Sequence, residues 1–289
     1  MFFQVNNFKI LMSTVIIPIL IFFLLLTLSP NSDAGNNNFP NEKIIDDKVD
    51  NTLANLVKSI NVNYKKSLEG NYDDKPLNTA NQKLTTYLLN MCSGARIVFK
   101  SKLLQSQKAG LDFASSDDGL LKLFTWDTLT GGTMHYYKTI ALFVPKNSPH
   151  KDGAEYKSVE FPLIKVDTDG GDSGLWYGSD AIKQINTKNN KTVYLLLGTG
   201  IYSTIDHGSS IQAVNIDGNN LKPYNFFKTK TKTLNSIECD FHEDDSHEIT
   251  LSNDNHKLLV PLLNEKGVCT GKNLVYEFDG SLFVYSKVE

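Results

Sequence analysis

Asp127 and His135 are the two residues of this sequence best placed to form an acid–base pair. They lie in the segment Trp126-Asp-Thr-Leu-Thr-Gly-Gly-Thr-Met-His135. A carboxylate beside an imidazole can orient the ring and help it to transfer a proton. The Gly131-Gly132 pair between them would let the backbone approach a bound molecule closely. The pattern offers Asp127 and His135 as candidate catalytic residues of a hydrolase.

The same segment also supports a binding site without catalysis, because an Asp, a His and an exposed aromatic ring suit a sugar or a peptide. A structural interpretation competes with it, in which Trp126 is core, Asp127 satisfies a turn and His135 packs beside Tyr136. For catalysis we favour the structural interpretation, and for binding the sequence leaves both open. The candidate binding residues in this region are Asp117, Asp118, Trp126 and Thr133.

Gly171-Asp-Ser-Gly174 reproduces the nucleophile loop of chymotrypsin-like serine proteases. His135 or His150, Asp152 or Asp167, and Ser173 follow the chain order of that catalytic triad. However, His135 precedes Ser173 by only 38 residues, too few to build the first barrel of such a protease, and Leu175 replaces the next Gly of the loop. We therefore interpret the loop as turn chemistry.

Three carboxylates of the same Gly-rich loop, those of Asp167, Asp169 and Asp172, are the candidate metal ligands and would suit calcium. Their spacing is not that of an EF-hand, so a solvated acidic loop is the favoured interpretation. A second acidic stretch at 238–248 lacks the spacing of a tetrahedral zinc site and is interpreted as a charged surface loop. The sequence indicates no cofactor.

From Ser116 to His135 the chain contains the block Ser-x-Asp-Gly-x-Leu-x₄-Trp-Asp-Thr-x-Thr-Gly-Gly-Thr-Met-His. This block resembles one that opens the β domain in a family of uncharacterised exported envelope proteins of Gram-negative bacteria. The resemblance covers most of residues 110–289 and does not extend to residues 35–95. It implies architecture and export, and it carries no catalytic role because the family has no assigned reaction. It continues at 198–203, 210–212, 227–230, 234–237 and 275–278.

The first 34 residues are expected to direct export. Residues 10–28 form an apolar stretch after Lys9, and Ser32 and Ala34 suit a cleavage site before Gly35. Because about 20 apolar residues can span a bilayer, the alternative is an uncleaved inner-membrane anchor. Either case places residues 35 onward in the periplasm or outside the cell, with membrane contact only through residues 10–28 if they are retained.

Apolar periodicity predicts a polar tether and helical segment at 35–96, with helices over 46–68 and 78–91. From residue 97 to 289, short apolar runs alternate with turns, and Asp-Gly pairs at 118–119, 217–218 and 279–280 predict hairpins. We therefore expect a mainly β fold, an antiparallel sandwich, barrel or small propeller, with an N-terminal helical segment. Two loose Asp-box patterns, at 115–119 and 204–208, would favour propeller blades.

Composition narrows the possible partners. A net charge of −3 and a pI near 6.1 argue against nucleic-acid binding. Among the three cysteines, Cys239 and Cys269 are the better candidates for a disulfide, and three buried thiols are the alternative.

The leading functional expectation is an exported binding module. Its partner would be a protein, peptide or glycan of the cell envelope, and an inhibitor or immunity protein would be one version. The export signal and the 16 Phe, 12 Tyr and 2 Trp residues support it. The alternatives are a secreted hydrolase that uses Asp127 and His135, or Asp169 and Asp172, and a purely structural envelope protein.

Overall fold

The computed structural model describes residues 40–70, 73–91, 101–148, 155–161, 178, 180–242 and 248–289. They belong to one compact unit, Phe39–Glu289. The expected signal or anchor at 1–34 lies outside these residues. No helix in the described part is both long enough and apolar enough to cross a membrane.

Three helices and three sheets make up the described part. The helices are α1 (Pro40–Glu69), α2 (Lys75–Leu89) and α4 (Leu104–Ala109). Sheet A contains β1 (Asp112–Ser115), β2 (Leu121–Asp127), β3 (Tyr137–Phe143) and β4 (Lys157–Phe161) in that order. Sheet B contains β5 (Ala181–Asn186), β6 (Thr192–Ile201), β7 (Asp206–Asp217) and β11 (Ser236–His242), with β8 (Asn220–Pro223) paired to β7.

Sheet C is assembled from the remaining strands in the order β10-β9-β15-β14-β13-β12. Its one parallel pair joins β15 to β9, and its other pairs are antiparallel. The strand bounds are β9 (Phe227–Lys228), β10 (Thr233–Leu234), β12 (Thr250–Leu251), β13 (Lys257–Leu263), β14 (Cys269–Phe278) and β15 (Phe283–Val288).

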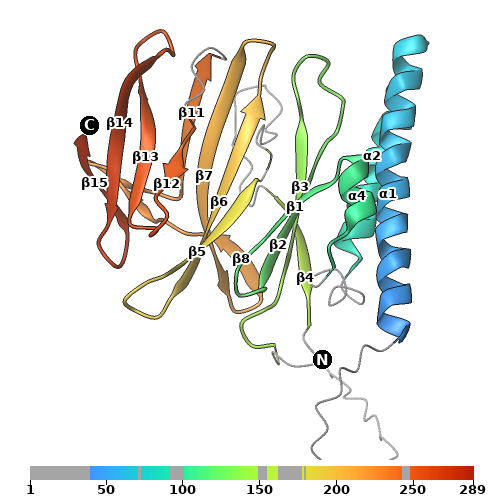
Figure 1. Cartoon of the computed structure of the whole chain (residues 1–289), viewed down its shortest axis with the longest axis horizontal. Coiled ribbons are helices and arrows are strands. Elements are labelled where there is room, and N and C mark those ends of the chain that lie inside the picture. Colours follow the sequence, from blue (N-terminus) through green and yellow to red (C-terminus); the bar gives the residue numbers. More distant parts are fainter. Residues whose placement is uncertain are drawn as a thin grey trace, which may run out of the picture. The chain divides into compact units, whose positions relative to one another are not determined.

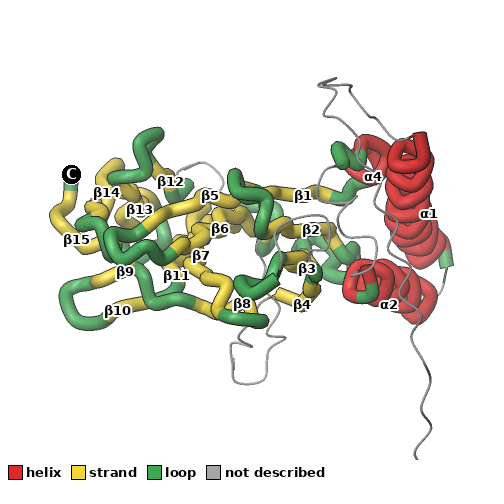
Figure 2. Tube along the Cα trace, turned by 90° about the horizontal axis from the view of Figure 1, so that it is seen from below, coloured by secondary structure: helices red, strands yellow, loops and turns green. Residues whose placement is uncertain are grey.

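The helices and the sheets are stacked in layers (Figure 1), and sheet B lies between sheets A and C. The three helices gather beside sheet A, away from the strands of sheet C (Figure 2). One apolar cluster joins the helices to sheet A, a second joins sheet A to sheet B, and a third joins sheet B to sheet C. The expected mainly β class with an N-terminal helical segment is confirmed, in the form of open stacked sheets and with no closed barrel in the described residues.

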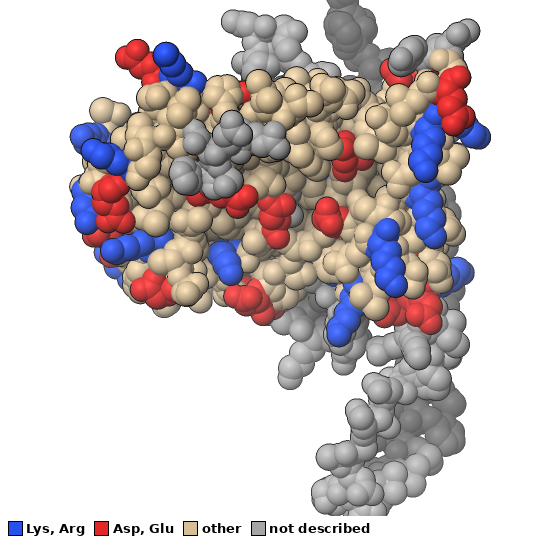
Figure 3. Space-filling model, turned by 45° about the horizontal axis from the view of Figure 1, so that its top comes forward, with Lys and Arg blue, Asp and Glu red and all other residues tan. Residues whose placement is uncertain are grey.

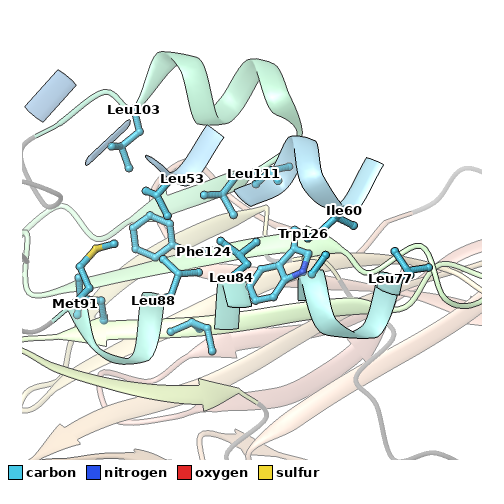
Figure 4. Packing of buried hydrophobic residues seen from close by; sticks show 14 residues of the cluster. Leu53, Ile60, Leu77, Leu84, Leu88, Met91, Leu103, Leu111, Phe124 and Trp126 are labelled. Carbon is cyan, nitrogen blue, oxygen red and sulfur yellow. The ribbon is translucent and has the colours of Figure 1, made fainter. Parts of the chain in front are cut away.

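Sheet A is buried on both faces because its strands alternate between two apolar clusters. On β2, Phe124 and Trp126 pack against the helices, whereas Leu121 and Leu123 pack toward sheet B. Strand β3 alternates in the same way. Figure 4 shows the ring of Trp126 among apolar side chains of both long helices.

The helical period correctly predicts α1 and α2. Leu53, Val57 and Ile60 of α1 and Leu84 and Leu88 of α2 are buried in the cluster against sheet A. Helix α1 begins at Pro40, earlier than expected, and α2 has a Pro in its first turn, where its missing N–H costs no hydrogen bond. Residues 35–39 of the expected tether lie outside the described residues.

Helix α4 was not predicted, because its six residues show no apolar period. Its N-terminus is held by the carboxylate of Asp50 on α1, which accepts hydrogen bonds from the amides of Gln105 and Ser106 at 2.8 Å each. These amides would otherwise lack partners in so short a helix. The side chain that caps this helix is more than 50 residues away in the sequence, so local pattern could not reveal it.

All three predicted Asp-Gly hairpins are present. They join β1 to β2, β7 to β8 and β14 to β15. Gly119, Gly218 and Gly280 have φ values of +67°, +58° and +89°, which favour glycine over other residues.

Lys122 is a cation buried between sheet A and the helices, with 1% of its surface exposed. Its Nζ lies 4.1 Å from the centre of the Phe113 ring and 3.4 Å from the Ser101 carbonyl oxygen. Burial lowers the pKa of Lys122 from 10.5 to about 8, and the charge of Asp46 opposes this shift. The folded protein therefore binds fewer protons than the unfolded chain between about pH 8 and 10.5, so Lys122 makes stability rise with pH in that range.

Replacing this lysine tests the buried cation directly. Between pH 8 and pH 10, the unfolding free energy of the wild type should rise by about 2 kcal/mol more than that of Lys122→Met. The variant lacks the ammonium group that titrates in this range. Urea denaturation at the two pH values measures the difference. Lys183→Met, at an exposed position on β5, is the matched control and should follow wild type. Identical pH slopes for wild type and Lys122→Met would contradict the assignment.

Candidate functional site

The face of sheet A that packs on sheet B changes from apolar to polar toward one end of β2 and β3. Thr125 and Thr139 face each other across the two strands, with their hydroxyl oxygens 3.0 Å apart. The next pair on that face is Asp127 and Tyr137. In order, the face carries Leu121, Leu123, Thr125 and Asp127 on β2, and Phe143, Ala141, Thr139 and Tyr137 on β3.

Asp127 and His135 form a close pair at this polar end. The Oδ2 atom of Asp127 lies 2.7 Å from Nδ1 of His135, and Oδ1 accepts a hydrogen bond from the Leu129 amide at 2.8 Å. The His135 side chain is 39% exposed and that of Asp127 is 20% exposed. Because Nδ1 is engaged by the carboxylate, Nε2 is the ring nitrogen left to accept a proton or a hydrogen bond. Asp127 thus satisfies the turn, as the structural interpretation expected, and also orients His135.

The loop between β2 and β3 is held on both sides. The Thr128 amide and hydroxyl both donate to the Tyr136 carbonyl at 2.8 Å. The His135 amide donates to the Ile201 carbonyl of β6 at 3.0 Å, which ties the loop to sheet B. The position of His135 is therefore set by both sheets.

Gly131 allows the loop between β2 and β3 to pack closely against itself. A Cβ atom at this position would collide with the Met134 carbonyl oxygen and the Tyr136 ring. Gly132 has φ of +68° and open space around its Cα. At Gly131 the close approach that only glycine permits is to the loop itself, whereas the sequence interpretation assigned it to a ligand.

Trp126 does not contribute an exposed ring. It is 1% exposed, and its Nε1 donates to Oδ1 of Asn81 on α2 at 2.9 Å. The Asn81 amide group donates in turn to the Thr128 carbonyl at 2.9 Å. The expectation that Trp126 binds a ligand is corrected: strand alternation turns it toward the helices, and it anchors the loop that carries His135.

Asp117 and Asp118 lie at the other end of β2, away from Asp127. Asp118 accepts hydrogen bonds from the Ser116 hydroxyl at 2.6 Å and the Leu120 amide at 3.0 Å, which closes the β1–β2 turn. It also accepts one from the Tyr194 hydroxyl of β6 at 2.8 Å, and burial together with this carboxylate raises the pKa of Tyr194. Asp118 is thus structural, and the structure does not bring the pair together with Thr133, which is exposed in the His135 loop.

Three residues beside the pair were not predicted: Tyr137, Asp180 and Thr199. The ring centres of Tyr137 and His135 are 6.1 Å apart. Burial raises the pKa of Tyr137 to about 12, and the carboxylates of Asp127, Asp180 and Asp112 contribute. Asp180 precedes β5, 53 residues after Asp127, so no local pattern connects them.

Burial raises the pKa of Asp180, and a 2.9 Å hydrogen bond from the Thr199 hydroxyl partly opposes this shift. A Cβ placed on Gly178 would lie 3.7 Å from both Asp180 Oδ1 and a Tyr137 ring carbon, so these two side chains are neighbours. We use the name inter-sheet site for the group Asp127, His135, Tyr137, Asp180 and Thr199.

Carboxylates dominate the surroundings of the inter-sheet site. Asp112 and Glu248 both act to raise the pKa of Asp180. On the face drawn in Figure 3, Asp and Glu side chains lie across the middle as well as near both ends, whereas most Lys side chains lie toward the two ends. The site should therefore favour neutral or cationic ligands over anions.

A second Asp–His pair lies on sheet B. Nδ1 of His242 is 2.7 Å from Oδ1 of Asp206, and the two residues are register partners on β11 and β7. Their side chains are 47% and 44% exposed. This pair has the same chemistry as Asp127 and His135 in a more open setting, so it provides a control.

The sequence-based metal and protease candidates fall largely outside the described residues. These candidates are His150, Asp152, Asp167, Asp169, Asp172 and Ser173, together with residues 243–247 of the acidic stretch. Among the residues that the structure describes, no group of three or more His, Cys, Asp or Glu side chains could hold a metal ion. Cys92 is also outside, and neither Cys239 nor Cys269 is in a disulfide.

Two hollows in the described part lie away from the inter-sheet site. One, of about 710 Å³, lies along α1 and α2 and includes Val49, Tyr87 and Met91 in its lining. The other, of about 240 Å³, lies at the opposite end of β6 and β7 and is lined in part by Lys191 and Asp217. Neither includes Asp127 or His135 in its lining.

We compared the chain with protein-family models, with curated proteins and with solved structures, and none of the three comparisons found a match.

Gly131→Ala should disturb the loop, because the new Cβ meets a backbone carbonyl and a ring that cannot both move away. We expect a loss of about 1–3 kcal/mol in unfolding free energy and a changed His135 environment. Gly132→Asn is the control, since Asn tolerates positive φ and the space there is open. Urea denaturation and the NMR signals of the His135 ring measure the two effects. Equal effects of the two substitutions would argue against the packing role of Gly131.

Asn81→Leu tests whether the loop between β2 and β3 depends on its contact with α2. It leaves the Trp126 N–H and the Thr128 carbonyl without their buried partners, which should cost about 2–4 kcal/mol. Gln82→Leu, on the exposed side of the same helix, should change stability far less. Thermal and urea denaturation compare the variants, and a wild-type stability for Asn81→Leu would show that this contact contributes little.

Proposed function

We propose that the chain is an exported binding module of the cell envelope and that its ligand is a neutral or cationic glycan held at the inter-sheet site. The observation that supports it is the 2.7 Å pair between Asp127 and His135, which fixes a half-exposed imidazole with Nε2 available to a ligand. A group already held in its bound geometry loses little conformational freedom on binding.

The chemistry around the pair suits sugar hydroxyl groups. The imidazole Nε2 and the carboxylate oxygens accept hydrogen bonds from them, and the Tyr137 hydroxyl can donate or accept. The pKa of Tyr137, raised to about 12, keeps its hydroxyl protonated even in alkaline solution. An aromatic ring beside such groups also offers an apolar surface to a sugar face. An acidic surround disfavours anionic glycans, which narrows the ligand class.

Hydrolysis at the same site is the second candidate. His135, oriented by Asp127, has the geometry of a general base, and burial raises the pKa of Asp180, which is the direction that a general acid requires. Among the described residues no hydroxyl or thiol is hydrogen-bonded to His135, so this reaction would need His135 to activate water. Binding requires none of these steps, and for that reason we place it first.

Ligand screening with matched pairs of variants separates the two candidates. The purified full chain would be tested on an array of envelope glycans, and peptides would form a second panel. We expect His135→Ala to weaken glycan binding by up to about ten-fold, because a hydrogen bond to the oriented imidazole contributes up to about 1.4 kcal/mol. His242→Ala, in the similar but separate pair, should leave binding unchanged.

Further variants and products separate binding from hydrolysis. Asp127→Asn should weaken binding while Asp206→Asn does not, and melting temperatures of all four variants show whether folding is affected. Recovery of shortened glycans that depends on His135 would establish hydrolysis. Binding of peptides alone would replace the glycan, and equal losses in the His135 and His242 variants would remove the inter-sheet site from the proposal.

A further inference from the structure

Cys239 and Cys269 come from different sheets and share one apolar cluster. Cys239 lies on β11 of sheet B, is 5% exposed and belongs to the cluster between sheets B and C. Its Sγ is 3.7 Å from the carbonyl oxygen of Pro261 on β13. Cys269 begins β14 of sheet C and is the register partner of Leu263, two residues beyond Pro261. The two side chains thus approach the same stretch of β13.

Their electrostatic coupling agrees with this placement. Burial raises the pKa of Cys239 to about 11, and the next contribution comes from Cys269, ahead of Asp240. A negative charge on the Cys269 sulfur is therefore felt at Cys239. Cys269 itself is only partly buried against the cluster, so a reagent in solution reaches it more readily than Cys239.

We propose that Cys239 and Cys269 are a redox pair, which a disulfide oxidant in the surrounding compartment converts into an intramolecular disulfide that links sheet B to sheet C. Such a bond would join β11 to β14 across the segment that contains β12 and β13. It would close a loop in the unfolded chain and lower the conformational entropy of that chain, which stabilises the folded state. The two thiols lie between sheets B and C, apart from the inter-sheet site between sheets A and B.

The chemistry assigns each cysteine a step. The Cys269 thiolate attacks one sulfur of the oxidant's disulfide, and the other oxidant sulfur leaves and takes up a proton. The Cys239 thiol then loses its proton and attacks the Cys269 sulfur, and the second oxidant thiol leaves. Two protein thiols are oxidised and one oxidant disulfide is reduced to two thiols. Cys269 acts first because a buried thiol with a raised pKa is rarely ionised at neutral pH.

Oxidation of the native pair is the first experiment. The full chain carrying Cys92→Ser is incubated with oxidised glutathione, denatured, treated with N-ethylmaleimide and digested for mass spectrometry. We expect a peptide in which Cys239 is linked to Cys269, and a melting temperature raised by roughly 5–10 °C over the reduced protein. If N-ethylmaleimide alkylates both cysteines after the oxidation, or if the disulfide joins two molecules, the proposal is overturned.

The order of the steps has its own test. Cys239→Ala should trap glutathione on Cys269, because the second thiol that resolves the mixed disulfide is missing. Cys269→Ala should leave Cys239 unmodified over the same time, since Cys239 is the more deeply buried thiol. Near-equal rates of modification in the two variants would reject the assigned order. Far-UV circular dichroism of both variants confirms that each comparison is made on folded protein.

Discussion

The central strands β2 and β3 of sheet A are covered on both faces, and this constraint organises the rest of the described structure. These strands place Phe124 and Trp126 against the helices and the alternate residues against sheet B. Both faces are apolar over most of their length, so the helices and sheet B are each required to remove one face from water. The N-terminal helical segment is therefore part of the folded unit rather than an appendage. The same alternation places Asp127 toward sheet B once Trp126 points toward the helices.

Polar side chains connect the layers where the apolar contacts end. Asn81 joins α2 to Trp126 and to the Thr128 carbonyl, Asp118 joins the β1–β2 turn to Tyr194, and Asp50 holds the start of α4. Each of these contacts satisfies a group that burial would otherwise leave unpaired, and such contacts favour one register between layers over its alternatives. Apolar packing alone tolerates more sliding, since it has little directional preference.

The inter-sheet site arises from this arrangement because it lies where the core between sheets A and B becomes polar. Asp127 closes a turn with one oxygen and orients His135 with the other, and the backbone of His135 is tied to β6. The imidazole is thus held by both sheets before any ligand arrives. An oriented imidazole can serve ligand binding or catalysis. Catalysis requires in addition a reacting group within hydrogen-bond distance of Nε2. The neighbouring carboxylates make the surroundings of the site acidic and raise the pKa values of Tyr137 and Asp180.

Much of the local structure was already determined by the sequence. The apolar periods of α1 and α2, the three Asp-Gly hairpins and the mainly β class follow from neighbouring residues, because helix and turn geometry repeats over a few positions. Only the tertiary structure decided that Trp126 is buried, that α4 forms, and that Asp180 and Thr199 lie beside Tyr137. Each depends on which faces of distant segments meet. That is a property of packing between layers, which no repeat within one segment encodes.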